Sequence, residues 1–266
     1  MMTNLMIGRY LPGDSLVHRM DPRSKIVLVF YFICIVFLAD NGLSYLVLGL
    51  FTLLAVLLTK IKLIYFWRGI RPAIVLILFT VMIQVFFTRG GQIFWSWGPF
   101  ALSTAGLLNA WFIFLRLVII ICMSTLLTLT TSPLDISSAL SSLMTPLKWV
   151  HFPVDIIALM LSIALRFVPT LMDETVRIMN AQRARGVDFG SGNLIQQIKA
   201  VVPILIPLFV SAIQHAEDLD DAMTARGYRT DAPRTTYRII QWHTRDTLSF
   251  GVFIVLTVII LFVRTA

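Results

Sequence analysis

Long apolar runs that carry no charge limit what this chain can fold into more than any other feature. Five such runs occur, at residues 26–39, 43–59, 72–88, 105–131 and 247–263, and only the fourth is interrupted, by Arg116. Their lengths suit the hydrocarbon core of a bilayer better than the core of a soluble domain. The composition agrees, because 58% of residues are hydrophobic and 14% charged, against about 45–50% and 25% in soluble domains. The sequence therefore predicts an all-α integral membrane protein with about five transmembrane helices and excludes soluble, fibrous and disordered classes.

The positive charges predict how the chain is oriented. The formal net charge is +8, which in a membrane protein reflects topology and anionic headgroups before nucleic acid. With a cytoplasmic N-terminus, five spans leave Arg89 and Arg264 outside and Arg116 within the bilayer, so the other 19 of 22 Lys and Arg residues lie inside. We therefore expect a multi-pass protein of the cytoplasmic (cell) membrane that contacts lipid and binds no nucleic acid.

Shorter signals refine this outline. Asp21 and Pro22 are suited to the N-cap and first position of the first helix. Residues 60–71 mix basic and aromatic side chains, as expected at an anionic interface, and 89–99 read as an outer loop with an aromatic belt. Cys34 and Cys122 each lie within an apolar run, where we expect small buried side chains.

The region between the fourth and fifth spans is neither clearly soluble nor clearly transmembrane. It divides the chain into spans 1 to 4 (1–131), a membrane-associated and cytoplasmic helical region (132–242) and a last span (243–266). Ser132 and Pro133 begin a helix, and two longer helices follow around the apolar segments 154–172 and 201–213. If both segments crossed the membrane, the basic residues between them would lie outside. We therefore interpret them as long helices half sunk in the inner leaflet or packed under the bundle, and 201–213, with Pro203 and Pro207, as too short to span.

These two long helices end with the same pattern, A-x-x-A-R-G, at residues 181–186 and 222–227. One interpretation is structural: Gly186 and Gly227 end the helices in the left-handed region, and Arg185 and Arg226 complement the helix dipole. The other is that each arginine projects a planar five-donor group toward a partner. Two such ends suggest two docking points on a dimeric cytoplasmic partner.

The chain resembles the transmembrane T component of energy-coupling factor (ECF) transporters, the vitamin-importing branch of the ABC superfamily. The resemblance covers nearly the whole chain and rests on residues 18–25 (HRMDPRSK), 131–133 (TSP), 165–169 (LRFVP), Glu174, 181–182 (AQ) and the two Ala-Arg-Gly ends, the most specific mark. Met20 stands where Leu is more usual, a mild apolar exchange.

The resemblance implies a non-catalytic coupling subunit of an ATP-driven vitamin or micronutrient importer. Three coupling helices, two of them long, would cross on the cytoplasmic side and transmit the conformational change of two ATP-binding cassette ATPase subunits to a small membrane S component that binds the substrate. The implied ATPase-docking residues are Ala184, Arg185, Gly186, Ala225, Arg226 and Gly227. The implied S-component contacts are Pro203, Leu205, Pro207 and Leu208. No cofactor is expected in this chain, because the partner subunits would bind ATP and Mg.

Other chemistry has little support in the residues. No G-x-x-x-x-G-K-[ST] motif, metal-ligand spacing or catalytic triad occurs, so we expect no enzyme activity. The alternative is a self-contained secondary transporter with Arg116 at its substrate site, although Arg116 could also simply bond carbonyl groups. Glu217, Asp218, Asp220 and Asp221 form either a solvated face or a brace for Arg226. The sequence does not identify the vitamin.

Overall fold

The computed structural model describes residues 10–88, 90–97, 100–187, 189, 193–229 and 242–265. The chain forms two compact units, Met1–Leu140 with Ile240–Ala266, and Ser141–Ile239. We call them the bundle unit and the arm unit. The first boundary falls inside helix α6 (Pro133–Leu143), so most of this helix belongs to the bundle unit, whereas the sequence suggested a division at residue 131.

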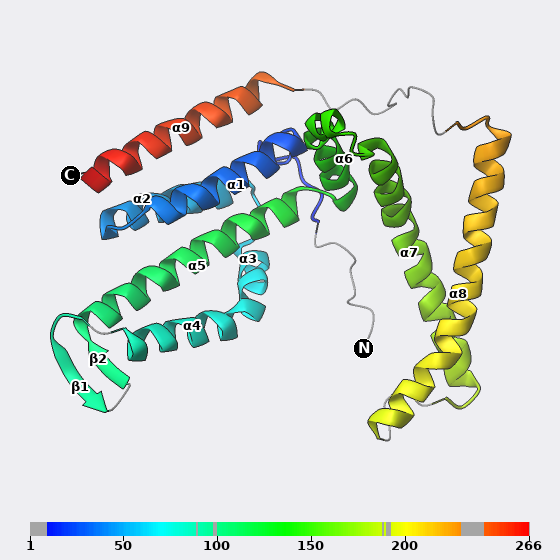
Figure 1. The fold of residues 1–266 in the computed structure, drawn as a ribbon, viewed down its shortest axis with the longest axis horizontal. Coiled ribbons are helices and arrows are strands. Elements are labelled where there is room, and N and C mark those ends of the chain that lie inside the picture. Colours follow the sequence, from blue (N-terminus) through cyan, green and yellow to red (C-terminus); the bar gives the residue numbers. More distant parts are fainter. Residues whose placement is uncertain are drawn as a thin grey trace. The chain divides into compact units, whose positions relative to one another are not determined.

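The bundle unit contains all five helices that the apolar runs predict (Figure 1). They are α1 (Pro22–Leu38), α2 (Gly42–Leu58), α4 (Ile74–Phe87), α5 (Thr104–Thr130) and α9 (Thr244–Thr265). The interfacial stretch before α4 is also helical, as α3 (Leu63–Ile70) and the 3-10 turn η1 (Arg71–Ala73). Asp21 caps α1, as predicted, by accepting from the backbone N–H of Arg23 at 2.7 Å. The protein is thus an all-α, multi-pass membrane protein, and the predicted fold class is confirmed.

The helices that are long and apolar enough to cross a membrane are not the same five as the apolar runs predict. Five helical stretches are long and apolar enough to cross a membrane: Leu63–Phe87, Thr104–Thr130, Val154–Ala184, Lys199–Ala225 and Thr244–Arg264. α1 and α2 have 17 residues each, or about 25 Å of helix against a hydrocarbon core of about 30 Å. The prediction that 201–213 is too short to span the membrane is wrong. These residues belong to the longer stretch Lys199–Ala225, which continues through Pro203 and Pro207.

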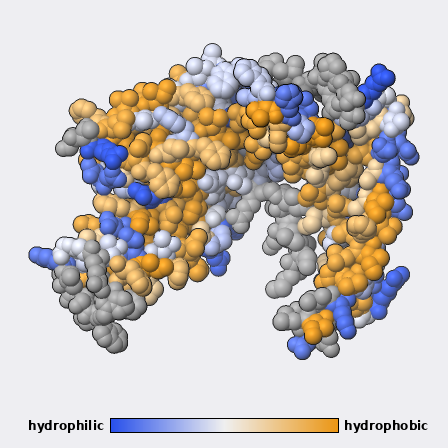
Figure 2. Space-filling model, in the orientation of Figure 1, coloured by the Kyte–Doolittle hydropathy of each residue, from blue (hydrophilic) through white to orange (hydrophobic). Residues whose placement is uncertain are grey.

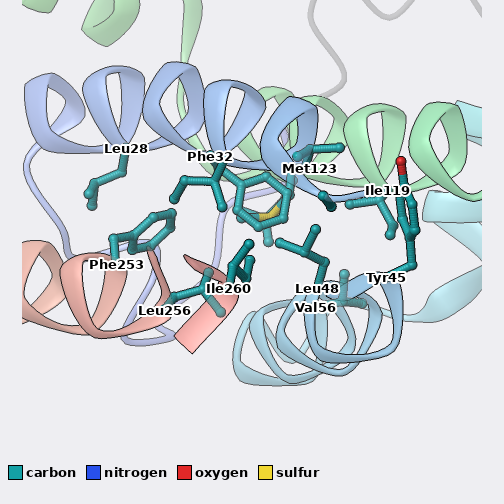
Figure 3. Close-up of a cluster of buried hydrophobic side chains, with 14 of the residues drawn as sticks. Leu28, Phe32, Tyr45, Leu48, Val56, Ile119, Met123, Phe253, Leu256 and Ile260 are labelled. Atoms are coloured by element: carbon teal, nitrogen blue, oxygen red, sulfur yellow. The ribbon is translucent and has the colours of Figure 1, made fainter. Parts of the chain in front are cut away.

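An aromatic and aliphatic core joins α1, α2, α5 and α9 (Figure 3). Phe32 is fully buried at its centre, and Phe51 and Phe253 pack edge to face with ring centroids 5.1 Å apart. α4 packs closely on α5 at Gly106, where an added Cβ would lie 3.0 Å from the Val85 carbonyl oxygen. Cys34 is exposed and Cys122 partly exposed, so the expectation that both are buried is wrong; both lie on helix faces outside this core.

The predicted loop between the third and fourth spans contains a two-stranded antiparallel hairpin. β1 (Ile93–Trp97) pairs with β2 (Phe100–Ser103), with Trp97 opposite Phe100. Aromatic and β-branched residues favour strands, which explains why this aromatic segment pairs with itself. Ser103 then caps α5 by accepting from the Gly106 N–H at 3.1 Å.

A polar junction fixes the start of α1 to the start of α9. Asp246 is fully buried, and its Oδ1 accepts from the Asp21 N–H at 2.9 Å and from the Ser24 hydroxyl at 2.8 Å. Lys25 donates to the carbonyl oxygens of His18 and Thr130, each at 3.1 Å. Partial burial lowers the pKa of His18 from 6.5. The HRMDPRSK segment therefore builds this end of the bundle.

The arm unit consists mainly of two long helices, α7 (Val154–Ala184) and α8 (Leu194–Ala225), with the 3-10 turn η2 (Thr145–Val150) before them. The two helices pack against each other. α7 includes Pro169, and α8 includes Pro203 and Pro207. The prediction of two long helices in this region is confirmed.

Candidate functional site: paired arginine helix ends

The two Ala-Arg-Gly motifs form the same backbone structure. Gly186 and Gly227 have φ of +85° and +68°. The N–H groups of Gly186 and Val187 donate to the carbonyls of Arg183 and Gln182, both at 3.0 Å. The second end repeats the pattern of these two hydrogen bonds.

Gly227 donates to Thr224 at 2.9 Å and Tyr228 donates to Met223 at 3.0 Å. Each end is therefore a complete Schellman motif, and the predicted left-handed glycines are confirmed.

The arginine side chains at these ends are exposed. Within the part of the chain that the structure describes, neither Arg185 nor Arg226 forms a side-chain hydrogen bond or an ion pair. An added Cβ at either following glycine would also meet nothing within 4 Å. Ala184 and Ala225 are exposed as well. Among the residues that the structure describes, each end thus presents a guanidinium without a partner beside a small, uncovered backbone surface.

The structure places the two ends far apart. Contacts pair Gln182 with Pro203 and Glu174 with Ser211 and His215, so residue numbers rise along one helix as they fall along the other. α7 and α8 are therefore antiparallel, as Figure 1 also shows. The Arg185 end lies beside the start of α8, and 23 residues of helix separate Pro203 from Arg226, or about 35 Å.

A polar cluster joins the middle of the two helices. The hydroxyl of Ser211 donates to both Glu174 carboxylate oxygens, at 2.9 and 2.8 Å. His215 Nε2 lies 3.1 Å from Glu174 Oε1, and its ring stacks on Phe167 at 5.8 Å. A carboxylate with two hydrogen-bonding partners on the facing helix fixes register more strongly than apolar contact does.

The prolines of α8 create a second link. Pro207 has no N–H, so it cannot donate to the carbonyl of Pro203 four residues earlier. Gln182 of α7 donates its side-chain N–H to that carbonyl oxygen at 3.4 Å. A side chain of the same chain thus takes the place of the helical donor that Pro207 lacks.

The predicted S-component contacts lie on a largely uncovered apolar surface. Figure 2 shows apolar side chains along much of the arm unit. Leu205 is 54% exposed; Pro207 is exposed, and Pro203 and Leu208 are partly buried. Further exposed apolar residues between positions 201 and 213 are Val201, Val202, Ile206, Phe209, Val210 and Ile213. We call residues 201–213 of α8 the apolar segment.

Arg116 and the acidic residues before Arg226, both singled out in the sequence, have ordinary structural surroundings. Arg116 donates to the Tyr45 hydroxyl at 3.0 Å and to the Ala39 carbonyl at 3.2 Å, and its guanidinium lies 5.3 Å from the Phe37 ring centroid. These contacts tie α5 to the turn between α1 and α2 and favour the structural interpretation. The acidic residues 217, 218, 220 and 221 are all exposed, and none forms an ion pair with Arg226 among the described residues.

Sequence reasoning missed the partners of Glu174 and Gln182. Ser211 and His215 lie four residues apart on α8 and so share a face, as do Glu174 and Gln182, eight apart on α7. This spacing indicates a polar stripe on each helix. It predicts contacts between the stripes only once the two helices are known to pack together. Within the described residues, no group of His, Cys, Asp and Glu side chains could hold a metal ion.

The chain is similar to known proteins along almost its full length. The sequence model of the cobalt transport protein family, CbiQ, matches residues 13–237. The energy-coupling factor transporter transmembrane protein EcfT of Lacticaseibacillus paracasei is 55% identical over 263 residues, covering 99% of this chain and 100% of that protein. EcfT 1 of Listeria monocytogenes is 52% identical over 266 residues and EcfT of Bacillus subtilis 48% over 264, each covering at least 99% of both chains.

Proposed function

Because the chain belongs to the CbiQ/EcfT family of energy-coupling factor transporter transmembrane proteins, we propose that it is the non-catalytic coupling subunit of an ATP-driven importer. As a transport subunit of this family it works in a complex. The proposed partners are two ATP-binding cassette ATPase subunits and a small membrane S component that binds a vitamin or another micronutrient. ATP and Mg would be bound by the ATPases.

One observation carries the proposal: two identically built helix ends lie at opposite ends of one antiparallel helix pair, and each has an exposed arginine with no side-chain partner among the described residues. A guanidinium forms charge-assisted, bidentate contacts with carboxylates or carbonyl groups. Two equal docking points suit two copies, or two homologues, of one partner better than a single small ligand.

The links between α7 and α8 suggest how movement would be transmitted. Glu174 with Ser211 and His215, and Gln182 with Pro203, connect the helices at two levels. If the ATPases move relative to each other on binding ATP, their displacement acts on both ends of a connected pair. The apolar segment lies on the same pair, so an S component held there would feel the same displacement.

The test is charge reversal at the helix ends. We expect Arg185→Glu and Arg226→Glu to lose the ATPases on affinity purification, because loss of a buried charged contact typically costs roughly 2–5 kcal/mol. Arg71→Glu, an exposed arginine of the bundle unit, serves as the control and keeps the ATPases. If both single variants insert normally, retain the ATPases at wild-type yield and support uptake, the docking role is wrong.

A further inference from the structure

A partly open cavity lies wholly within the bundle unit. Its volume is about 460 Å³, within the roughly 300–1,000 Å³ of ligand pockets. α1, α2, α5, α9 and the segment before α1 all contribute to its wall, which is mostly apolar and includes Leu28, Leu58, Leu126 and Val252. Phe51 and Phe253, which pack edge to face, also line it; Phe253 belongs to the aromatic core shown in Figure 3.

The opposite end of this cavity is cationic. Lys25 and Arg245 line it there, at the first turns of α1 and α9. The ammonium of Lys25 is directed at two backbone carbonyl oxygens. Arg245 is exposed, and its side chain has no hydrogen bond or ion pair among the residues the structure describes. Eight residues of α9 separate Arg245 from Phe253, so the cavity extends about 12 Å away from the charge.

The indole of Trp242 indicates the depth of this end in the membrane. Trp242 lies two residues before α9 and is 54% exposed. Its ring stacks on Phe250 at 5.7 Å and donates to the Thr247 hydroxyl at 2.9 Å. Trp side chains at the ends of apolar helices lie at the level of lipid headgroups. The charged end of the cavity is therefore at headgroup depth, and the aromatic end faces the hydrocarbon region.

We propose that this cavity binds one acyl chain of an anionic phospholipid whose phosphate contacts Arg245. The apolar wall suits the headgroup-proximal part of a hydrocarbon chain, and a cation at headgroup depth attracts negatively charged lipids. A free phosphate would leave the apolar wall uncovered, while a lipid without net charge would leave the arginine uncompensated. This site is distinct from the paired helix ends, and its existence does not depend on the proposed docking role.

The experiment uses the full-length chain in mild detergent, incubated with dioleoyl phosphatidylglycerol, dioleoyl phosphatidylcholine or glycerol phosphate, and counts bound molecules by native mass spectrometry. Wild type should retain one phosphatidylglycerol in preference to phosphatidylcholine and no glycerol phosphate. Arg245→Glu should weaken phosphatidylglycerol binding roughly tenfold, and Ala55→Phe, which fills the cavity, should weaken both lipids. Arg71→Glu, an exposed arginine that does not line the cavity, is the matched control.

The outcomes separate the parts of the proposal. The role of the phosphate contact would be overturned if wild type retained phosphatidylglycerol and phosphatidylcholine equally and Arg245→Glu retained both to the same extent as wild type. Unchanged lipid retention in a folded Ala55→Phe variant would overturn the cavity as the site, as would binding of glycerol phosphate in place of lipid. If Ala55→Phe elutes as aggregate, Ser249→Leu, which also narrows the cavity, replaces it. A loss of lipid with Arg71→Glu equal to that with Arg245→Glu would show a general surface-charge effect and contradict the specific site.

Discussion

A single backbone angle determines the shape of each arginine end. Gly186 and Gly227 adopt positive φ although nothing within 4 Å would obstruct a side chain at either position. The need for glycine is therefore conformational and not steric. Because the left-handed region costs other L-residues roughly 1–2 kcal/mol, these glycines allow the chain to turn away from the helix directly after Arg185 and Arg226.

We predict that Gly186→Ala loosens this helix end while leaving the rest of α7 intact. The cost of about 1–2 kcal/mol should speed hydrogen exchange at the amides of residues 186 and 187 about 5- to 30-fold, since these amides form the two Schellman bonds. Gly186→Asn, which tolerates positive φ better, should exchange more slowly than the alanine variant. Equal exchange in wild type and Gly186→Ala would contradict this account.

At the scale of elements, α7 and α8 are held together by few polar links. Glu174 accepts from Ser211 and contacts His215, and these are the described side-chain interactions that fix the centre of the pair. A helix pair with one carboxylate at its crossing depends strongly on that residue, because removing it leaves two polar partners without an acceptor.

We therefore predict that Glu174→Ala lowers substrate uptake per assembled complex while the ATPases stay bound. Asp173→Ala is the matched control, since Asp173 is an adjacent, exposed carboxylate with no described partner. Losing the hydrogen bonds that Glu174 accepts should lower the melting temperature of the purified chain. Uptake at the control level in a Glu174→Ala complex would show that the central link does not transmit movement.

The apolar segment of the same helix gives a separate prediction. Leu205→Glu should reduce retention of the S component and lower uptake while the ATPases remain, because Leu205 is exposed and the arginine ends lie elsewhere on the pair. Leu208 is only partly buried, so we expect Leu208→Glu to act in the same direction as Leu205→Glu. Ile195→Glu, at an exposed position on α8 before the segment, should retain the S component. Loss of the ATPases with the S component kept would reverse the assignment.

The sequence predicted those features that depend on neighbouring residues along the chain. Asp21 with Pro22 and the two Ala-Arg-Gly ends are local signals, and the structure confirms the helix start and both helix ends. Contacts between distant segments left no such pattern: the buried Asp246 junction and the Glu174 cluster appear only when helices meet. The hairpin was missed because the same aromatic residues suit an interfacial loop and a strand.

At the scale of the whole molecule, the antiparallel arrangement of α7 and α8 restricts how the chain can lie in a membrane. Both helices are long and apolar enough to cross it. If both crossed, however, their C-terminal ends would lie on opposite sides, and Arg185 and Arg226 could not both reach cytoplasmic ATPases. The docking proposal therefore requires a pair that lies along the cytoplasmic face, as the many basic residues near its ends also favour.

This requirement can be tested by labelling single cysteines in cells with a membrane-impermeant thiol reagent, after replacing Cys34 and Cys122 with alanine. Asn193→Cys lies near the Arg185 end and Asp221→Cys near the Arg226 end; both positions are exposed. We expect both to react only after lysis. Gln92→Cys should react from outside and serves as the positive control. Gly91 is unsuitable for that control, because its φ is +68° and a Cβ would lie 2.3 Å from the Thr104 hydroxyl. External labelling of one of the two arm positions would mean that α7 and α8 span the membrane, and would rule out ATPase docking through both arginines.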